Sequence, residues 1–237
     1  MNPIPLVRRR WGALVALLAA AALLLALVIA NRPAAAAGSA GSAAAGQHQH
    51  GQPPAPRTAQ QVAFHDQMRK LWEDHVTWTR LAIVTFADGS AGFDATAARL
   101  LQNQTDIGDA VKPFYGDAAG TQLTALLHDH ITIAVEVLQA AKAGDTDAFN
   151  AANARWYANA NDIADFLAAA NPRFWPQAQM RAAMQTHLDQ TLTEASHELG
   201  GDYAAGVADY EEIHLHILAM ADQLSAGIIG QFPSRFH

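Results

Sequence analysis

Histidine has the widest chemical range of the residues in this chain, and three histidines recur at nearly equal intervals. His130 follows His75 after 55 residues, and His187 follows after a further 57. His75 and His130 each lie at the centre of an apolar helical stripe, and His214 lies on another near the end of the chain. A buried imidazole needs a hydrogen-bond partner or a metal ion. These histidines are therefore candidate metal ligands.

A repeated heptapeptide supplies polar partners for the histidines. The chain reads NQTDIGD and, fifty-six residues later, NANDIAD. In two antiparallel helices, residues equidistant from the connecting turn lie at one level. This rule places Asp106 level with His75, and it places Asn159 level with His130, with Asp162 within one turn. We therefore expect the repeated Asn and Asp residues, including Asn159, Asp106 and Asp162, to meet the buried imidazoles across each hairpin.

A third, weaker copy of the pattern begins at His187. Across a shorter turn this histidine is level with His214 and within one turn of Glu211. A metal site inside a helical bundle needs imidazole and carboxylate groups from different helices at one height, and these ligands suit Zn, Cu or Fe. The sequence thus predicts a transition-metal site. Its candidate ligands are His75, His130, His187, His214, Glu211, Asp106 and Asp162.

Two other interpretations stay open. In the first, each histidine and carboxylate form a structural pair without an ion, in a non-enzymatic structural or interaction module of the cell envelope. The second is a ferritin-like di-iron protein, because the segments EASH and EEIH, which end at His197 and His214, match the Glu-x-x-His pattern. However, His197 falls opposite the apolar stripe of its helix, and inward glutamates are too few for such a centre.

Composition and motifs exclude several classes of protein. The chain has no cysteine, which excludes disulfides, thiolate nucleophiles, cysteine zinc sites and covalent haem attachment. A net charge of -7, without a cluster of Lys or Arg beyond residue 32, argues against a nucleic-acid partner. No nucleophile elbow, phosphate-binding loop or zinc-protease helix is present in the sequence. The sequence therefore predicts no recognisable enzyme activity.

The N-terminal part carries a membrane signal. In residues 1–32, three arginines precede the uncharged run WGALVALLAAAALLLALVIA, whose length favours an uncleaved transmembrane anchor. Small residues at Ala35 to Ala37 also fit a cleavage site, which would make the protein secreted. Residues 33–58, rich in Ala, Gly, Ser and Pro, predict a disordered tether in which His48 and His50 are incidental. Both alternatives place the remaining chain outside the cytoplasmic membrane.

Residues 59–237 show the hydrophobic period of helices throughout. Gly, Asp, Asn and Pro interrupt the pattern at short connections, which make consecutive helices antiparallel neighbours. The fold class predicted is an all-α bundle of six helices arranged as three helical hairpins. The predicted helices span residues 59–88, 94–113, 118–143, 146–170, 176–199 and 202–230.

Several segments resemble a group of small exported bacterial helical proteins. They are LWEDHVTWTR, RLLQNQTDIG, KPFYG, RWYANANDIADFL and GIIGQFP, and the resemblance covers most of residues 66–233. Members of the group are labelled acetylglutamate kinase or glycosyltransferase, but this sequence has no pattern for the nucleotide or sugar-nucleotide sites that such enzymes need. The resemblance implies a helical fold and export, and no residue role.

Overall fold

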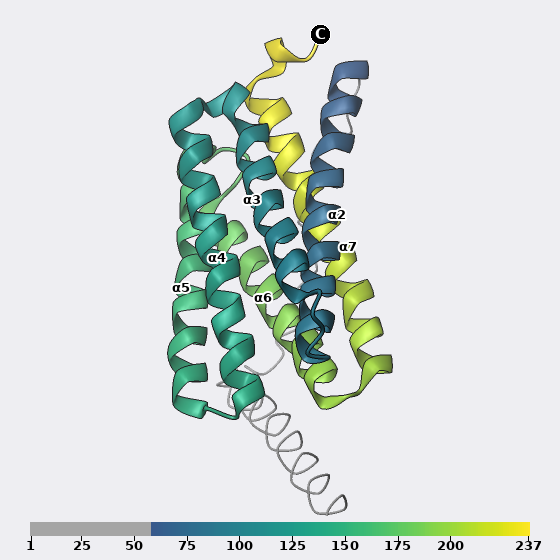
Figure 1. The fold of residues 1–237 in the computed structure, drawn as a ribbon. Coiled ribbons are helices and arrows are strands. Elements are labelled where there is room, and N and C mark those ends of the chain that lie inside the picture. Colours follow the sequence, from purple (N-terminus) through teal and green to yellow (C-terminus); the bar gives the residue numbers. More distant parts are fainter. Residues whose placement is uncertain (1–57) are drawn as a thin grey trace, which may run out of the picture.

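The computed structural model describes residues 58–237, which form six α-helices in a bundle (Figure 1). The helices are α2 (Ala59–Ala87), α3 (Phe93–Tyr115), α4 (Asp117–Ala143), α5 (Thr146–Ala170), α6 (Gln177–Gly200) and α7 (Tyr203–Gln231), followed by the short 3-10 helix η1 (Pro233–Arg235). No strand occurs in this part of the chain, so the all-α prediction is confirmed. Each helix begins and ends within two residues of its predicted bounds.

Local capping interactions explain where the helices begin and end. The Thr58 side chain accepts from the backbone N–H of Gln61, and the Gln61 side chain accepts from the backbone N–H of Thr58, which together form a capping box. Asp145 caps the start of α5 through the backbone N–H of Ala148. Gly144, with φ of 71°, ends α4 in the left-handed region that favours glycine. Gly144 and Asp145 together make the short turn that sets α4 and α5 antiparallel.

Each helix packs against the next one in the chain, and α7 packs against α2 to close the ring. The first helices of the three hairpins, α2, α4 and α6, therefore run in the same direction (Figure 1). In addition, α2 touches α6 directly. Side chains at similar heights on these three parallel helices can consequently meet inside the bundle.

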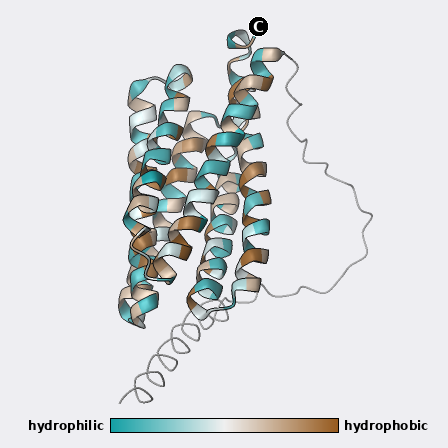
Figure 2. Ribbon diagram, turned by 45° about the vertical axis from the view of Figure 1, so that its right-hand side comes forward, coloured by the Kyte–Doolittle hydropathy of each residue, from teal (hydrophilic) through white to brown (hydrophobic). Residues whose placement is uncertain are grey.

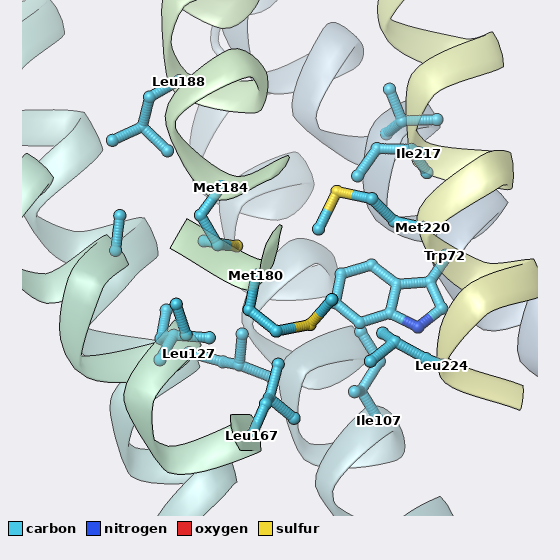
Figure 3. Close-up of a cluster of buried hydrophobic side chains, with 14 of the residues drawn as sticks. Trp72, Ile107, Leu127, Leu167, Met180, Met184, Leu188, Ile217, Met220 and Leu224 are labelled. Carbon is cyan, nitrogen blue, oxygen red and sulfur yellow. The ribbon is translucent and has the colours of Figure 1, made fainter. Parts of the chain in front are cut away.

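The interior is filled by large apolar side chains. Figure 2 shows apolar and polar positions alternating along the individual helices, as amphipathic helices require. In Figure 3 the side chains of Met180, Met220 and Leu224 gather around Trp72, which is 6% exposed. Unbranched methionines fill irregular gaps around a bulky indole. This core extends along the bundle and holds the hairpins together.

The predictions for residues 1–32 and for most of residues 33–58 fall outside the described part of the chain. Within that part, one helix, α7, is long and apolar enough to cross a membrane by length and composition. That helix also packs against α2 and α6, and the core helix of a folded domain passes the same test. The predicted anchor and tether therefore stay predictions from the sequence.

Candidate functional site

Three buried histidines, one from each hairpin, lie together inside the bundle. His75 comes from α2, His130 from α4 and His187 from α6, and these residues are 2%, 2% and 4% exposed. The ring centroid of His187 lies 5.7 Å from that of His75 and 6.2 Å from that of His130. We call these three residues the histidine cluster. The predicted burial of His75 and His130 is confirmed.

In the second hairpin, one amide side chain orients the imidazole. Asn159 Oδ1 lies 2.9 Å from Nδ1 of His130, and Asn159 Nδ2 donates to the carbonyl oxygen of Leu126 at 3.0 Å. Because that carbonyl can only accept, the amide nitrogen faces it and the amide oxygen faces the ring. His130 therefore carries its proton on Nδ1 and a lone pair on Nε2. The predicted level match of Asn159 with His130 is confirmed.

In the first hairpin, two neighbouring side chains make the corresponding contacts, one with the backbone carbonyl and one with the histidine ring. Asn103 Nδ2 donates to the carbonyl oxygen of Leu71 at 2.9 Å. Gln104 Nε2 donates to the carbonyl oxygen of Leu100 at 2.8 Å and lies 3.2 Å from Nδ1 of His75. An amide nitrogen cannot accept a hydrogen bond, so Nδ1 of His75 is an acceptor that shares the two N–H groups of Gln104 with the carbonyl oxygen of Leu100 and with Asn103 Oδ1, which lies 3.2 Å away. The neutral His75 ring then carries its proton on Nε2.

The third hairpin repeats part of this arrangement with a histidine. His216 follows His187 by 29 residues, the separation that also joins the other two cluster histidines to their amide partners. Its Nε2 lies 3.0 Å from the carbonyl oxygen of Ala183, four residues before His187. Leu71 and Leu126 hold the same position relative to their histidines. His216 lies off the apolar stripe of its helix, and the constant separation of 29 residues is the sequence signal that identifies it.

Two ring nitrogens of the histidine cluster are fully buried and have no hydrogen-bond partner among the described residues. They are Nε2 of His130 and Nδ1 of His187, and both atoms are buried. Buried polar atoms without a partner are rare in folded proteins, because leaving water without a replacement bond costs free energy. These two nitrogens are therefore open to a further partner.

Burial keeps the histidine cluster neutral. Loss of hydration lowers the pKa of His75 to about 3 and that of His130 to about 4, against the ordinary value of 6.5. The same cause holds the pKa of His187 well below 6.5, and repulsion from the neighbouring imidazoles adds to it. A neutral imidazole is the form that binds a metal ion.

A cavity of about 50 Å³ adjoins the histidine cluster. Apolar side chains from α2, α3, α4, α5 and α6 form most of its wall, and none of its lining residues is acidic. Thr79 and Thr191 also line it, but each hydroxyl donates at 2.8 Å to the carbonyl oxygen of the histidine four residues earlier, His75 and His187 respectively. The imidazoles are therefore the main polar groups that this cavity offers to a guest.

The expectation that the repeated aspartates meet the buried histidines is wrong. Asp106 accepts from Gln102 at 3.0 Å and lies 3.6 Å from Arg99, at the surface of α3. Asp162 is exposed on α5. The physical reason is that α3 packs against both α2 and α4, so its buried face is wide enough to include Gln104, which takes the place expected for Asp106.

The remaining candidate ligands do not join the histidine cluster either. His214 Nε2 lies 3.3 Å from Glu73 Oε1 on α2, and its ring stacks on that of Tyr210 with centroids 5.9 Å apart. Glu211 is exposed to solvent. The histidine of the other Glu-x-x-His segment also has a different partner, since His197 Nδ1 lies 2.6 Å from Asp209. The described residues thus bring no di-iron ligand set together.

A buried ionic cluster lies nearer the α6–α7 turn. Arg80 of α2 contacts Glu194 at 3.0 Å and Glu198 at 2.5 Å, and both glutamates are almost fully buried. Burial raises the pKa of Glu194 to about 7, although the Arg80 guanidinium opposes this shift. A Cβ added at Gly206 would lie 2.4 Å from Glu198, so α7 approaches this cluster closely. Burial of Glu194 was not predicted, because glutamate normally marks a solvated face.

In residues 58–237, no group of three or more His, Asp or Glu side chains is arranged to hold a metal ion in the conformation seen. No family model matches the chain, and no curated protein or solved structure shows significant similarity to it. Function therefore has to be argued from the histidine cluster and its surroundings.

Proposed function

We propose that this bundle binds a transition metal ion, of the class Zn, Cu or Fe, at the histidine cluster. The observation that carries the proposal is the pair of buried, partnerless imidazole nitrogens on His130 and His187. Both belong to rings that burial holds neutral, and a neutral ring nitrogen with a free lone pair is a metal ligand. A bound ion would supply the missing interaction.

The surroundings of His130 support this proposal. A histidine that binds a metal through one nitrogen usually donates the other N–H to an oxygen, which fixes the tautomer and the ring orientation. Asn159 accepts in this way from Nδ1, while its own amide is anchored to the carbonyl of Leu126. The lone pair of Nε2 is thereby presented to the bundle interior. Binding requires the imidazole rings to rotate about their side-chain bonds, and the adjoining cavity gives them room.

The second candidate is a non-enzymatic structural or interaction module of the cell envelope. It is favoured by the amide partners Gln104 and Asn159, which contact His75 and His130 within their own hairpins without an ion. In this alternative the histidine cluster only specifies how three hairpins pack. Placement at the membrane, through the apolar run near the N-terminus, belongs to both candidates and rests on the sequence alone.

Metal retention by the full chain separates the two candidates. The protein is purified in detergent, treated with chelator, loaded separately with Zn, Cu or Fe, and dialysed before elemental analysis. We expect about one ion per chain for at least one metal. We also expect a higher melting temperature, since a ligand at about 100 times its Kd stabilises the native state by about 2.7 kcal/mol. The His130→Ala and His187→Ala variants are expected to lose the ion.

The control variants exclude binding elsewhere. His128→Ala changes a half-buried histidine on α4 outside the histidine cluster, and its metal content should match that of the wild type. Replacing His48 and His50 together removes the only histidines of the predicted tether, again without an expected loss. Metal-free wild-type protein whose melting temperature does not respond to any of the three metals would overturn the proposal in favour of the structural alternative.

A further inference from the structure

The two open nitrogens belong to neighbouring rings that lie close enough together to share one metal ion. An imidazole nitrogen binds a metal at about 2 Å, so two rings lie roughly 6 Å apart between centroids when the ligands are opposite each other, and roughly 5 Å apart in a tetrahedral site. The centroids of His130 and His187 are 6.2 Å apart, with an angle of 26° between the ring planes. The two rings are therefore close enough for one ion to bridge them once the side chains have rotated so that both nitrogens face it.

The third ring is less suited to be a ligand. Nδ1 of His75 faces the amide nitrogen of Gln104, whose direction is fixed by the carbonyl oxygen of Leu100. The proton of the neutral ring is then on Nε2, which leaves that atom without a lone pair for a metal. His75 can lie beside an ion held by the other two rings without binding it.

The charge of the surroundings limits the charge of the ion. No lining residue of the adjoining cavity is acidic, and the histidine cluster is itself neutral. The cost of placing an ion in an apolar interior grows with the square of its charge, so a monovalent ion bears about a quarter of the cost of a divalent ion of the same size. Zn and Fe sites in proteins commonly include carboxylates or thiolates that offset the charge, and this site offers none.

We propose that the ion is monovalent copper, Cu(I), held in a two-coordinate site between Nε2 of His130 and Nδ1 of His187. This inference rests on the proposed function and makes it specific. Cu(I) is the monovalent transition ion that accepts two nitrogen ligands without further charge compensation. The copper is taken up and released without a change of oxidation state, so no electron donor or acceptor is required.

Competition between metals tests the inference on the full chain in detergent. Cu(I) is titrated without oxygen against a chromophoric Cu(I) chelator, and Zn(II) is titrated against a chromophoric zinc chelator under the same buffer conditions. We expect one Cu(I) per chain, bound at least about 100-fold more tightly than Zn(II). Fluorescence of Trp156, whose ring centroid lies 5.3 Å from that of His130, should fall as Cu(I) binds. X-ray absorption of the copper-loaded wild type should show two nitrogen neighbours.

Variants identify the ligands. His130→Leu and His187→Leu should each weaken Cu(I) binding by about 100-fold or more, whereas His75→Leu should weaken it by less than tenfold. Helicity by circular dichroism checks that each variant is folded, and the absorption spectrum of the wild type decides the coordination number even if a variant fails to fold.

The outcomes that oppose this inference are separable from failure of the proposed function. If Zn(II) binds as tightly as Cu(I), the choice of Cu(I) is wrong, but the proposed metal site remains. If X-ray absorption shows three nitrogen neighbours and His75→Leu weakens binding as much as the other two variants, the site uses all three histidines and is not two-coordinate. Absence of any bound metal would overturn both.

Discussion

The side-chain amide of Asn159 contacts both a buried histidine and a backbone carbonyl. In the first hairpin these two contacts are made by separate residues, Gln104 and Asn103. Asn159 both contacts the ring of His130 and donates to the carbonyl oxygen of Leu126. In the third hairpin, His216 repeats only the second of these contacts, to the carbonyl oxygen of Ala183. At the scale of single residues, the three hairpins are therefore related by their hydrogen bonds even where the residue types differ.

Removal of this amide should destabilise the fold. Asn159→Ala removes two buried hydrogen bonds and leaves Nδ1–H of His130 without an acceptor, which should cost about 2 to 3 kcal/mol of unfolding free energy. Urea unfolding measures the difference. The matched control is Asn161→Ala, an exposed position of the same helix, with an expected change within about 0.5 kcal/mol. Equal losses in both variants would contradict the role of Asn159.

Glu194 should make stability depend on pH. Its pKa in the folded protein is raised to about 7 by burial, against 4.5 ordinarily, so the folded state binds this proton more tightly than the unfolded state. The stability that it contributes is complete below pH 4.5 and is lost as pH rises to about 7. In Glu194→Gln this loss is absent. Urea unfolding between pH 5 and pH 8 should show that the unfolding free energy of the variant rises relative to that of the wild type as pH rises. An equal pH dependence of the two free energies would contradict a buried, protonated Glu194.

At the scale of helices, close approach of backbones decides which pairs form. A Cβ added at Gly108 of α3 would lie 2.7 Å from the carbonyl oxygen of Gly120 on α4 and 1.9 Å from Oγ1 of Thr124. A Cβ at Gly120 would similarly lie 2.6 Å from the carbonyl oxygen of Gly108. Glycine at both positions lets the first and second hairpins touch through their backbones, which brings α4 close enough to carry His130 into the interior.

Packing of α3 against α4 should therefore not tolerate an alanine in place of Gly108. Gly108→Ala favours an isolated helix by up to about 1 kcal/mol, but the clash with the backbone of α4 forces the helices apart, and we expect a net loss of about 2 kcal/mol or more. Gly92→Ala is the control, because its added Cβ meets only Ser90 at 3.4 Å. Thermal unfolding followed by circular dichroism measures both. A stabilised Gly108→Ala variant would show that steric contact between α3 and α4 does not limit their packing.

At the scale of the whole molecule, three hairpins contribute one neutral imidazole each to a common interior. The folded-state pKa of all three is lowered, to about 3 for His75 and to about 4 for His130, so the stability that they contribute is present above pH 6.5 and is lost as pH falls through the lowered values. The unfolded chain takes up about three protons at these sites near pH 5.5, and the folded chain holds one more at Glu194. Unfolding therefore takes up about two protons at these four groups.

Acid should consequently unfold the bundle. A net uptake of two protons lowers the unfolding free energy by about 3 kcal/mol for each pH unit between about 6 and 5. Urea titrations at half-unit intervals measure this slope. In the Glu194→Gln variant the slope should rise to about 4 kcal/mol per pH unit, because the opposing proton is absent. A wild-type stability that does not change in this range would mean that the imidazoles are not buried as neutral rings.

The sequence by itself determined the six helices, their bounds and the burial of His75 and His130. These properties depend on residues close together in the chain: apolar side chains at helical spacing, capping side chains such as Thr58, and left-handed glycines such as Gly144. The level of Asn159 opposite His130 also followed from the chain, because it requires only the rise per residue and the position of one turn.

Only the tertiary structure decided which polar groups meet the histidines. Gln104 rather than Asp106 contacts His75, because packing of α3 against two neighbours turns its buried face by an amount that the apolar stripe of one helix does not define. His214 contacts Glu73 on α2 instead of joining His187, because α7 packs against α2 and so completes the circle of six helices. The meeting of three histidines from separate hairpins has the same origin. The rotation of each helix about its axis is set by all the helices packed around it, and those neighbours are distant in the sequence.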